Sequence, residues 1–266
     1  MKIPFCCSVL CLCVVLAVPV YAQGPHVSAP VFFALNPQTN TVLWERDAHT
    51  KRPITSLTKL MTAMLLFGSD VEMTRVVTIT YSDVRRVSTT RLRAGDKVSV
   101  EDLLHLMLIA SDNGAARALA RTSAGNLTTF VERMNTKAVE LKLSDTHYAD
   151  PSGLLSQNVS SAFDIANLLL LSSADERIST IMRLATYSTR IGKRIVRVLN
   201  TNHLVRDGSV PVLAGKTGYT RKSGFCLASV FSTSRGDRVV VVVLGAPTNK
   251  ARFADVRSMY ALINEE

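Results

Sequence analysis

The order in which the hydrophobic spacing changes along this chain is the strongest constraint on its fold. Two strand-like runs flank a turn-rich spacer at residues 36–40 and predict a β-hairpin over 31–46, and residues 75–80 are typical of a short strand. Apolar residues then recur at helical spacing, which predicts helices from Ser56 to about 65 and over 99–109, 114–122, 128–141 and 161–172.

The last third of the chain returns to strand patterns. They cover residues 212–219, 224–232 and 237–245, and a helical pattern follows over 253–263. The links among these strands have hairpin length, so we expect an antiparallel sheet. The chain shows no internal repeat and no linker-like segment. We therefore expect one α/β (α+β) unit, with helices flanking the sheet and a mainly helical subdomain inserted at about 80–185.

The first 22 residues have the features of a cleaved secretory signal. Lys2 precedes an apolar run, which ends in the small-x-small sequence Val20-Tyr21-Ala22. Four of the five cysteines lie in the first thirteen residues, so the expected single domain, 23–266, keeps only Cys226 and can form no internal disulfide. We expect Cys226 to be a small buried residue on a strand. We expect no stable membrane anchor after the signal is removed.

The formal charge of +10 raises the question of anionic partners. Arg85, Arg86, Arg91, Arg93 and Lys97 form a basic run of the kind found at nucleic-acid interfaces. An exported chain does not meet nucleic acid, so we expect no such partner. Attraction to anionic polymers of the cell envelope is the milder hypothesis.

Three short motifs carry the candidate chemistry, and they are, in chain order, Ser56-Leu57-Thr58-Lys59, Ser111-Asp112-Asn113 and Lys216-Thr217-Gly218. S-x-x-K and S-x-N each arise about once by chance in this composition, whereas K-T-G arises about 0.04 times. The first motif opens a predicted helix, the second follows a predicted helix, and the third lies in a predicted strand. In this context the three motifs together are a far more specific signal than any one of them. Common zinc, thiol-redox, phosphate-loop and G-x-S-x-G motifs are absent, so we expect no metal and no cofactor.

These residue types suit nucleophilic catalysis by a serine. Ser56 at a helix start lies near unpaired backbone N–H groups, and Lys59 lies on the same face, within reach of its hydroxyl. Lysine accepts the serine proton only when neutral, and burial together with a nearby Lys216 would lower its pKa from the usual value of about 10.4. Ser111 can relay a proton to a leaving amine, and Asn113 can orient Lys59 and the substrate.

The third motif suits substrate binding. Lys216 and Thr217 offer a positive charge and a hydroxyl to a substrate carboxylate. Gly218 would let the substrate backbone approach the strand closely. The backbone N–H groups of Ser56 and Tyr219 are candidates for an oxyanion hole.

The sequence around these motifs resembles the low-molecular-mass penicillin-binding proteins, which are serine-type D-alanyl-D-alanine carboxypeptidases and endopeptidases. The similar segments are 54–63, 150–154 and 216–220. Residues 91–93, 200–206 and 224–227 look most like the D,D-endopeptidase branch of that family. The resemblance covers roughly residues 30–260.

The resemblance implies the serine β-lactamase/D,D-peptidase-like fold. It also implies cleavage of D-Ala-D-Ala termini or D-Ala cross-links in peptidoglycan, acylation by β-lactam antibiotics, and a role in cell-wall remodelling in the periplasm. In that family a residue matching Arg252 helps to receive the substrate carboxylate. Two features depart from the pattern. Asp112 in the middle motif is more typical of β-lactamases, and the chain stops at Glu266, so we expect no C-terminal anchoring domain.

Two alternatives stay open. A β-lactamase would need a glutamate that activates the deacylating water, but the sequence has no Glu between Glu140 and Glu176, where that loop is expected. A non-catalytic penicillin-binding or wall-binding protein would not need the nucleophile, base and proton shuttle that this sequence retains. Both features favour a D,D-peptidase.

Overall fold

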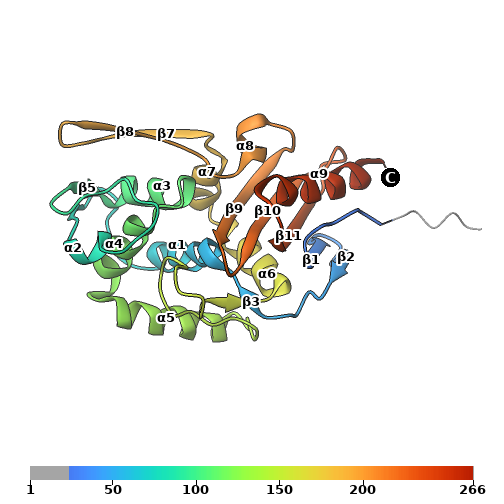
Figure 1. The fold of residues 1–266 in the computed structure, drawn as a ribbon, viewed down its shortest axis with the longest axis horizontal. Helices are drawn as coiled ribbons and strands as arrows, with labels where there is room; N and C mark the ends of the chain where they lie inside the picture. The colour runs from blue at the N-terminus through green and yellow to red at the C-terminus, as the bar shows by residue number, and fades with distance from the viewer. Residues whose placement is uncertain (1–23, 266) are drawn as a thin grey trace, which may run out of the picture.

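A five-stranded antiparallel sheet is the centre of the fold (Figure 1). The computed structural model describes residues 24–265, so the predicted signal peptide lies outside the described residues. The strand order is β2-β1-β11-β10-β9. The predicted hairpin and the three late strands are confirmed, as β1 (Val31–Asn36), β2 (Thr41–Arg46), β9 (Val212–Thr220), β10 (Gly224–Ser232) and β11 (Arg238–Ala246).

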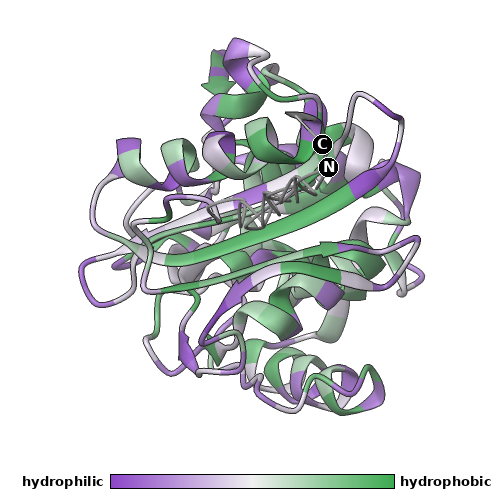
Figure 2. Ribbon diagram, turned by 90° about the vertical axis from the view of Figure 1, so that its right-hand side faces the viewer, coloured by the Kyte–Doolittle hydropathy of each residue, from purple (hydrophilic) through white to green (hydrophobic). Residues whose placement is uncertain are grey.

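Each face of this sheet buries its own hydrophobic layer. In β11, Val240 and Val242 pack toward the helices of the middle of the chain, whereas Val239 and Val241 pack toward the C-terminal helix α9 (Asn249–Glu265). Successive side chains of a strand point to opposite faces, so a strand covered on both sides is apolar throughout. Figure 2 shows the hydrophobic strands between helices on either side.

The middle of the chain supplies most of the helices. Their bounds are η1, a 3-10 turn (Thr55–Thr58), α1 (Lys59–Phe67), α2 (Tyr81–Val84), α3 (Val100–Ile109), α4 (Asn113–Ala124), α5 (Leu127–Glu140), α6 (Ala162–Ser173), α7 (Glu176–Arg183) and α8 (His203–Asp207). Side-chain caps fix where several begin: Ser99 accepts from the Asp102 N–H and Ser161 from the Asp164 N–H. Among residues 24–265, no helix is both long enough and apolar enough to cross a membrane.

The helix predicted from Ser56 begins three residues later than expected. Ser56 lies in η1, and the α-helix proper starts at Lys59. Thr55 has φ +47°, a left-handed conformation that turns the chain sharply just before Ser56. Leu57 and Leu60, which contribute to the helical spacing, are both buried here, so hydrophobic spacing alone does not reveal the turn.

A second hairpin escaped the sequence analysis altogether. β7 (Thr186–Ile191) and β8 (Arg194–Leu199) pair around Gly192, which has φ +58°. The hairpin lies on α3, where the Tyr187 hydroxyl donates to Asp102 at 2.7 Å and the Tyr187 ring stacks on His105. Alternating polar and apolar residues around a glycine are a hairpin signal that the sequence does contain.

Two short strand pairs complete the described elements. β4 (Val76–Thr78) pairs with β5 (Lys97–Ser99), which confirms the strand predicted at 75–80. β3 (Arg52–Pro53) pairs with β6 (Val159–Ser160) and ties the segment before η1 to the segment before α6.

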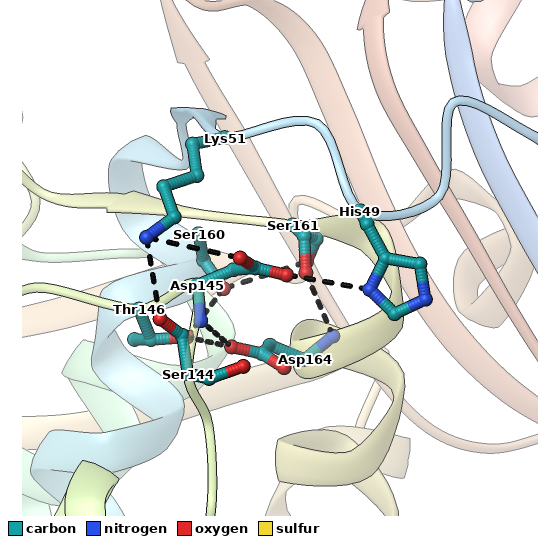
Figure 3. Close-up of polar contacts among 8 residues, drawn as sticks. All are labelled: His49, Lys51, Ser144, Asp145, Thr146, Ser160, Ser161 and Asp164. Atoms are coloured by element: carbon teal, nitrogen blue, oxygen red, sulfur yellow. Dashed lines mark hydrogen bonds and ion pairs between the residues drawn. The ribbon is translucent and has the colours of Figure 1, made fainter.

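A polar cluster next to β3 and β6 anchors these segments to one another (Figure 3). Asp164 Oδ2 accepts from the Asp145 N–H and from the Thr146 hydroxyl, both at 2.8 Å. Lys51 donates to the Ser144 carbonyl at 3.2 Å, and His49 Nδ1 lies 3.4 Å from Asp145 Oδ2. The cluster therefore fixes the start of the segment that leads from α5 toward β6.

Removing the Asp164 carboxylate should destabilise the protein. Asp164→Ala leaves the Asp145 N–H without its acceptor and should lower the free energy of unfolding by about 1–3 kcal/mol in urea titrations. Burial first, and then the Asp145 charge, raises the pKa of Asp164, so Asp164→Asn should cost less because its amide oxygen still accepts without bearing a charge. Equal stability of Asp164→Ala and the wild type would contradict this role.

Candidate active site

The first motif brings its serine and lysine together at the turn that starts α1. Lys59 Nζ lies 3.0 Å from Ser56 Oγ, as the spacing predicts. The lysine is fully buried, and its ammonium group finds two more acceptors: Asn113 Oδ1 at 2.6 Å and the Ser152 carbonyl at 2.5 Å. Three segments that are far apart in the sequence therefore converge on one amine.

The environment of Lys59 suits a proton acceptor. Burial lowers the pKa of Lys59 from 10.5 to about 7, against the opposing charges of Asp150 and Asp112. Desolvation penalises the charged form of a lysine, so the neutral amine is well populated near neutral pH. Burial therefore lowers the pKa of Lys59 as expected. The amine also lies within hydrogen-bond distance of the Ser56 hydroxyl, which it would deprotonate.

Two glycines pack closely against the turn that carries Ser56. A Cβ atom on Gly153 would lie 1.9 Å from the Thr55 carbonyl oxygen, and one on Gly218 would lie 2.4 Å from Thr55 Cγ2. Neither position can accept a side chain without moving the turn. The missing side chain of Gly218 thus lets β9 lie close to the serine turn, and the expected close approach of a substrate stays a prediction.

The loop between α5 and β6 forms the wall behind Lys59. Asp150 Oδ1 accepts from the Ser152 N–H, the Ser152 hydroxyl and the Gly153 N–H, and Oδ2 accepts from the Leu155 N–H and from Asn158 Nδ2. Burial opposes ionisation of Asp150, but these hydrogen bonds hold the pKa of its carboxyl below the usual range. The ionised carboxylate orders the loop and thereby aims the Ser152 carbonyl at Lys59.

The second motif lies where α3 ends and α4 begins. Ser111 has φ +60°, which turns the chain between the two helices. Asp112 caps α4 by accepting from the Ala115 N–H, and it also accepts from the Thr90 hydroxyl and the Arg91 N–H. Burial raises the pKa of Asp112 despite these bonds. Asp112, the unusual residue of the S-D-N motif, thus has a structural role, because it binds residues 90–91 next to the site.

Asn113 links this motif to Lys59 and to the neighbouring loop. Its Oδ1 accepts from Lys59, and its Nδ2 donates to the Ser88 carbonyl at 2.5 Å. Asn113 and Lys59 are therefore in contact, and the orienting role expected of Asn113 stays a prediction. The proton relay expected of Ser111 stays a prediction.

The third motif lies on β9, the edge strand beside η1. Lys216 is buried, and its pKa is lowered well below the ordinary value by burial and then by the charges of Lys59 and Arg252. A bound carboxylate would favour its protonated form. The Thr217 hydroxyl donates to Thr201 Oγ1 at 2.6 Å, and the Thr201 N–H donates to the Ile109 carbonyl at 3.0 Å. Thr201 thereby connects β9 to the end of α3.

Tyr219 and Arg252 occupy different environments. Tyr219 is 54% exposed, and its ring stacks on Phe225. The oxyanion role expected of its backbone N–H stays a prediction. Arg252 is only 6% exposed, and its Nη1 donates to the carbonyls of Gly218 and Cys226 at 2.9 and 3.0 Å. Arg252 therefore bridges β9 and β10 through one carbonyl of each strand. Its expected contact with a substrate carboxylate stays a prediction.

Asp150, Ser152 and Thr201 belong to the site but were not among the predicted site residues. Asp150 bonds only within its own loop, which no common site motif marks. The sequence does not reveal the contacts of Ser152 and Thr201, because Lys59 and Ile109 lie far from them in the chain. Within residues 24–265, no group of three or more His, Cys, Asp or Glu side chains could hold a metal ion. Cys226 is fully buried in β10, as expected.

Known proteins are similar in sequence to this chain over most of its length. Residues 19–248 match the peptidase S11 family, described as D-alanyl-D-alanine carboxypeptidase. A D-alanyl-D-alanine endopeptidase of Pseudomonas aeruginosa is 35% identical over 221 residues, which are 82% of this chain and 71% of that protein. A D-alanyl-D-alanine endopeptidase of Escherichia coli (strain K12) is 30% identical over 240 residues, 88% of this chain and 76% of that protein.

Solved structures show the same fold. The crystal structure of the Streptomyces K15 DD-transpeptidase has a TM-score of 0.84 and 27% identity, covering 91% of this chain and 99% of that one. Penicillin binding protein 5 from Haemophilus influenzae has a TM-score of 0.81 and 28% identity, over 89% of this chain and 71% of that one. The resemblance and the fold class inferred from the sequence are confirmed. The chain belongs to the peptidase S11 family of D-alanyl-D-alanine peptidases.

Proposed function

We propose that this chain is a serine D,D-peptidase that cleaves D-Ala-D-Ala termini or D-Ala cross-links of peptidoglycan stem peptides through an acyl-enzyme on Ser56. One observation carries the proposal: the buried Lys59 amine, with a pKa of about 7, contacts Ser56 Oγ at 3.0 Å. This pair supplies a nucleophile and its base without a histidine.

In the proposed reaction, Ser56 Oγ attacks the carbonyl carbon of the D-Ala residue before the scissile bond, and its proton passes to neutral Lys59. The tetrahedral intermediate collapses, the C–N bond breaks, and the leaving amine takes up a proton that Ser111 relays from Lys59. Water then attacks the ester, which releases the shortened peptide and returns a proton to Ser56. No cofactor enters this cycle.

The remaining motif residues would bind the substrate. Lys216 and Thr217 face a substrate carboxylate, Asn113 orients the peptide, and the N–H groups of Ser56 and Tyr219 stabilise the oxyanion. We assign Arg252 a positioning role, because its guanidinium holds the Gly218 carbonyl.

We favour cleavage of cross-links as the specific activity, because two relatives named as endopeptidases are 35% identical to this chain, whereas the relatives named as carboxypeptidases reach 32%. We further propose export by a signal at residues 1–22, action in the periplasm as the single domain 23–266, and acylation by β-lactams. The experiment that tests the function is incubation with a monomeric pentapeptide muropeptide and a cross-linked dimer. Cleavage of neither would refute it.

Ser56→Ala should abolish covalent penicillin labelling and muropeptide cleavage while leaving the fold intact, because only a hydroxyl is lost. Labelling followed by mass spectrometry, with circular dichroism for the fold, checks this. Ser234→Ala, on the exposed turn between β10 and β11, is the matched control and should label normally. Labelling of Ser56→Ala would rule out Ser56 as the nucleophile.

The acylation rate should rise with pH through about 7, the pKa of Lys59. A lowered lysine pKa means that the neutral base predominates above it, so the rate should reach a plateau near pH 8. At pH 6 the rate should be about tenfold below the plateau, because roughly one amine in ten is then neutral. Stopped-flow acylation by a chromogenic β-lactam measures this, and a rate that fell from pH 6 to 8 would contradict it.

The penicilloyl adduct should persist for minutes or longer. Asp150 is the carboxylate of the loop behind Lys59, and both of its oxygens are occupied by donors from the loop itself, so it is not free to activate a water. This feature, with the missing glutamate, disfavours a β-lactamase. Mass spectrometry of the adduct over time tests it, and turnover within seconds would favour the β-lactamase.

A further inference from the structure

The excess positive charge of this chain is concentrated in two segments outside the candidate active site. Residues 85–97 and the β7–β8 hairpin together contain nine arginines and lysines and one acidic residue, Asp96. Their formal excess of eight is most of the +10 of the whole chain. A charge so unevenly distributed creates a local field that attracts extended anions.

The two segments, which we together call the basic platform, meet where the hairpin contacts residues 91 and 96. Arg194 of the hairpin reaches across, and its Nη2 lies 2.6 Å from Asp96 Oδ2 while its Nη1 donates to the Arg91 carbonyl at 3.3 Å. The single acidic group of the platform is thereby neutralised by a local partner. Figure 1 shows the hairpin extended over α3 and toward β5.

The outer face of the hairpin is uncovered in the described part of the chain. Arg190 pairs with Ile195 and Ser188 with Arg197 across the two strands, and all four side chains are exposed. The alternate residues, such as Val196, are buried against the body of the protein. A flat ribbon that presents arginines and hydroxyls can meet a row of oxyanions, because guanidinium groups bind carboxylates in a bidentate way.

The platform is also joined to the candidate site. The Asn113 N–H donates to the Thr89 carbonyl at 3.0 Å, and Asn113 Nδ2 donates to the Ser88 carbonyl. Arg85, Arg86 and Arg91, all exposed, lie within a few residues of these contacts. A polymer bound to the platform would therefore pass beside the catalytic groups.

We infer that the basic platform binds polymeric peptidoglycan through the free carboxylates of stem peptides that neighbour the one being cleaved. This inference rests on the proposed function and names the form of substrate that the site prefers. A strand that bears many carboxylates engages several arginines at once, so that weak individual contacts give a useful joint affinity. A single soluble muropeptide has too few carboxylates to do so.

The test compares two double variants with the same change of net charge. Arg190→Glu/Arg197→Glu reverses the outer face of the hairpin, and Arg133→Glu/Lys250→Glu reverses exposed charges on α5 and α9, away from the platform. Co-sedimentation with purified sacculi should be about tenfold weaker for the first variant and nearly unchanged for the control. For the hairpin variant, the ratio of the sacculus cleavage rate to the soluble dimer cleavage rate should also fall.

Two further arms identify the ligand. Binding of the wild type should weaken in 0.5 M salt, since the Debye length falls from about 10 Å at 0.1 M to a few ångströms. It should also weaken when the sacculus carboxyls are converted to amides. Penicillin labelling confirms that each variant is folded. If the charge-reversed hairpin variant does not fold, Arg190→Gln/Arg197→Gln replaces it, and its loss of sacculus binding should be intermediate.

Equal binding by the two double variants, binding insensitive to amidation, or binding to anionic phosphatidylglycerol vesicles instead of sacculi would overturn the inference. Failure of the proposed function looks different. In that case the wild type would cleave neither muropeptide, while its charge-dependent binding to sacculi could still be measured.

Discussion

The burial of the Lys59 amine is the constraint on which the rest of the site depends. Lowering its pKa from 10.5 to about 7 corresponds to roughly 5 kcal/mol of free energy between its two protonation states. An amine so poorly solvated needs acceptors from the protein, and it takes them from η1, from the start of α4 and from the 150–155 loop. The sheet edge, the helices and the loop must all be in place before this set exists.

The sequence predicts the parts of this structure that depend on neighbouring residues. The valine-rich late strands, the capped helices at Ser99 and Ser161 and the pairing of Ser56 with Lys59 all follow from local spacing and were found. The family resemblance rested on the same short segments. One local signal, the alternation around Gly192 that marks the β7–β8 hairpin, was present but overlooked.

What escaped prediction depends on contacts between distant segments. Ser152 reaches Lys59 through its backbone carbonyl, so no side-chain motif could announce it. Thr201 joins Thr217 to the end of α3, a relation that exists only after folding. The contacts of Arg252 with the carbonyls of Gly218 and Cys226 likewise join distant segments, whereas its expected role toward a substrate carboxylate stays a prediction. Residue type and order suggested the chemistry, whereas three-dimensional packing decided which atoms supply it.

The left-handed Thr55, against which Gly153 and Gly218 both pack, links catalytic geometry to cooperative unfolding. A non-glycine residue in that conformation costs of order 1–3 kcal/mol, so the turn would relax if either neighbour withdrew. The Leu57 N–H, which donates to the Ile54 carbonyl at 3.2 Å, should therefore exchange with solvent mainly when β9 or the 150–155 loop opens. The serine turn behaves as part of the sheet edge rather than as an independent loop, and opening of either neighbour is enough to lose the geometry of the nucleophile.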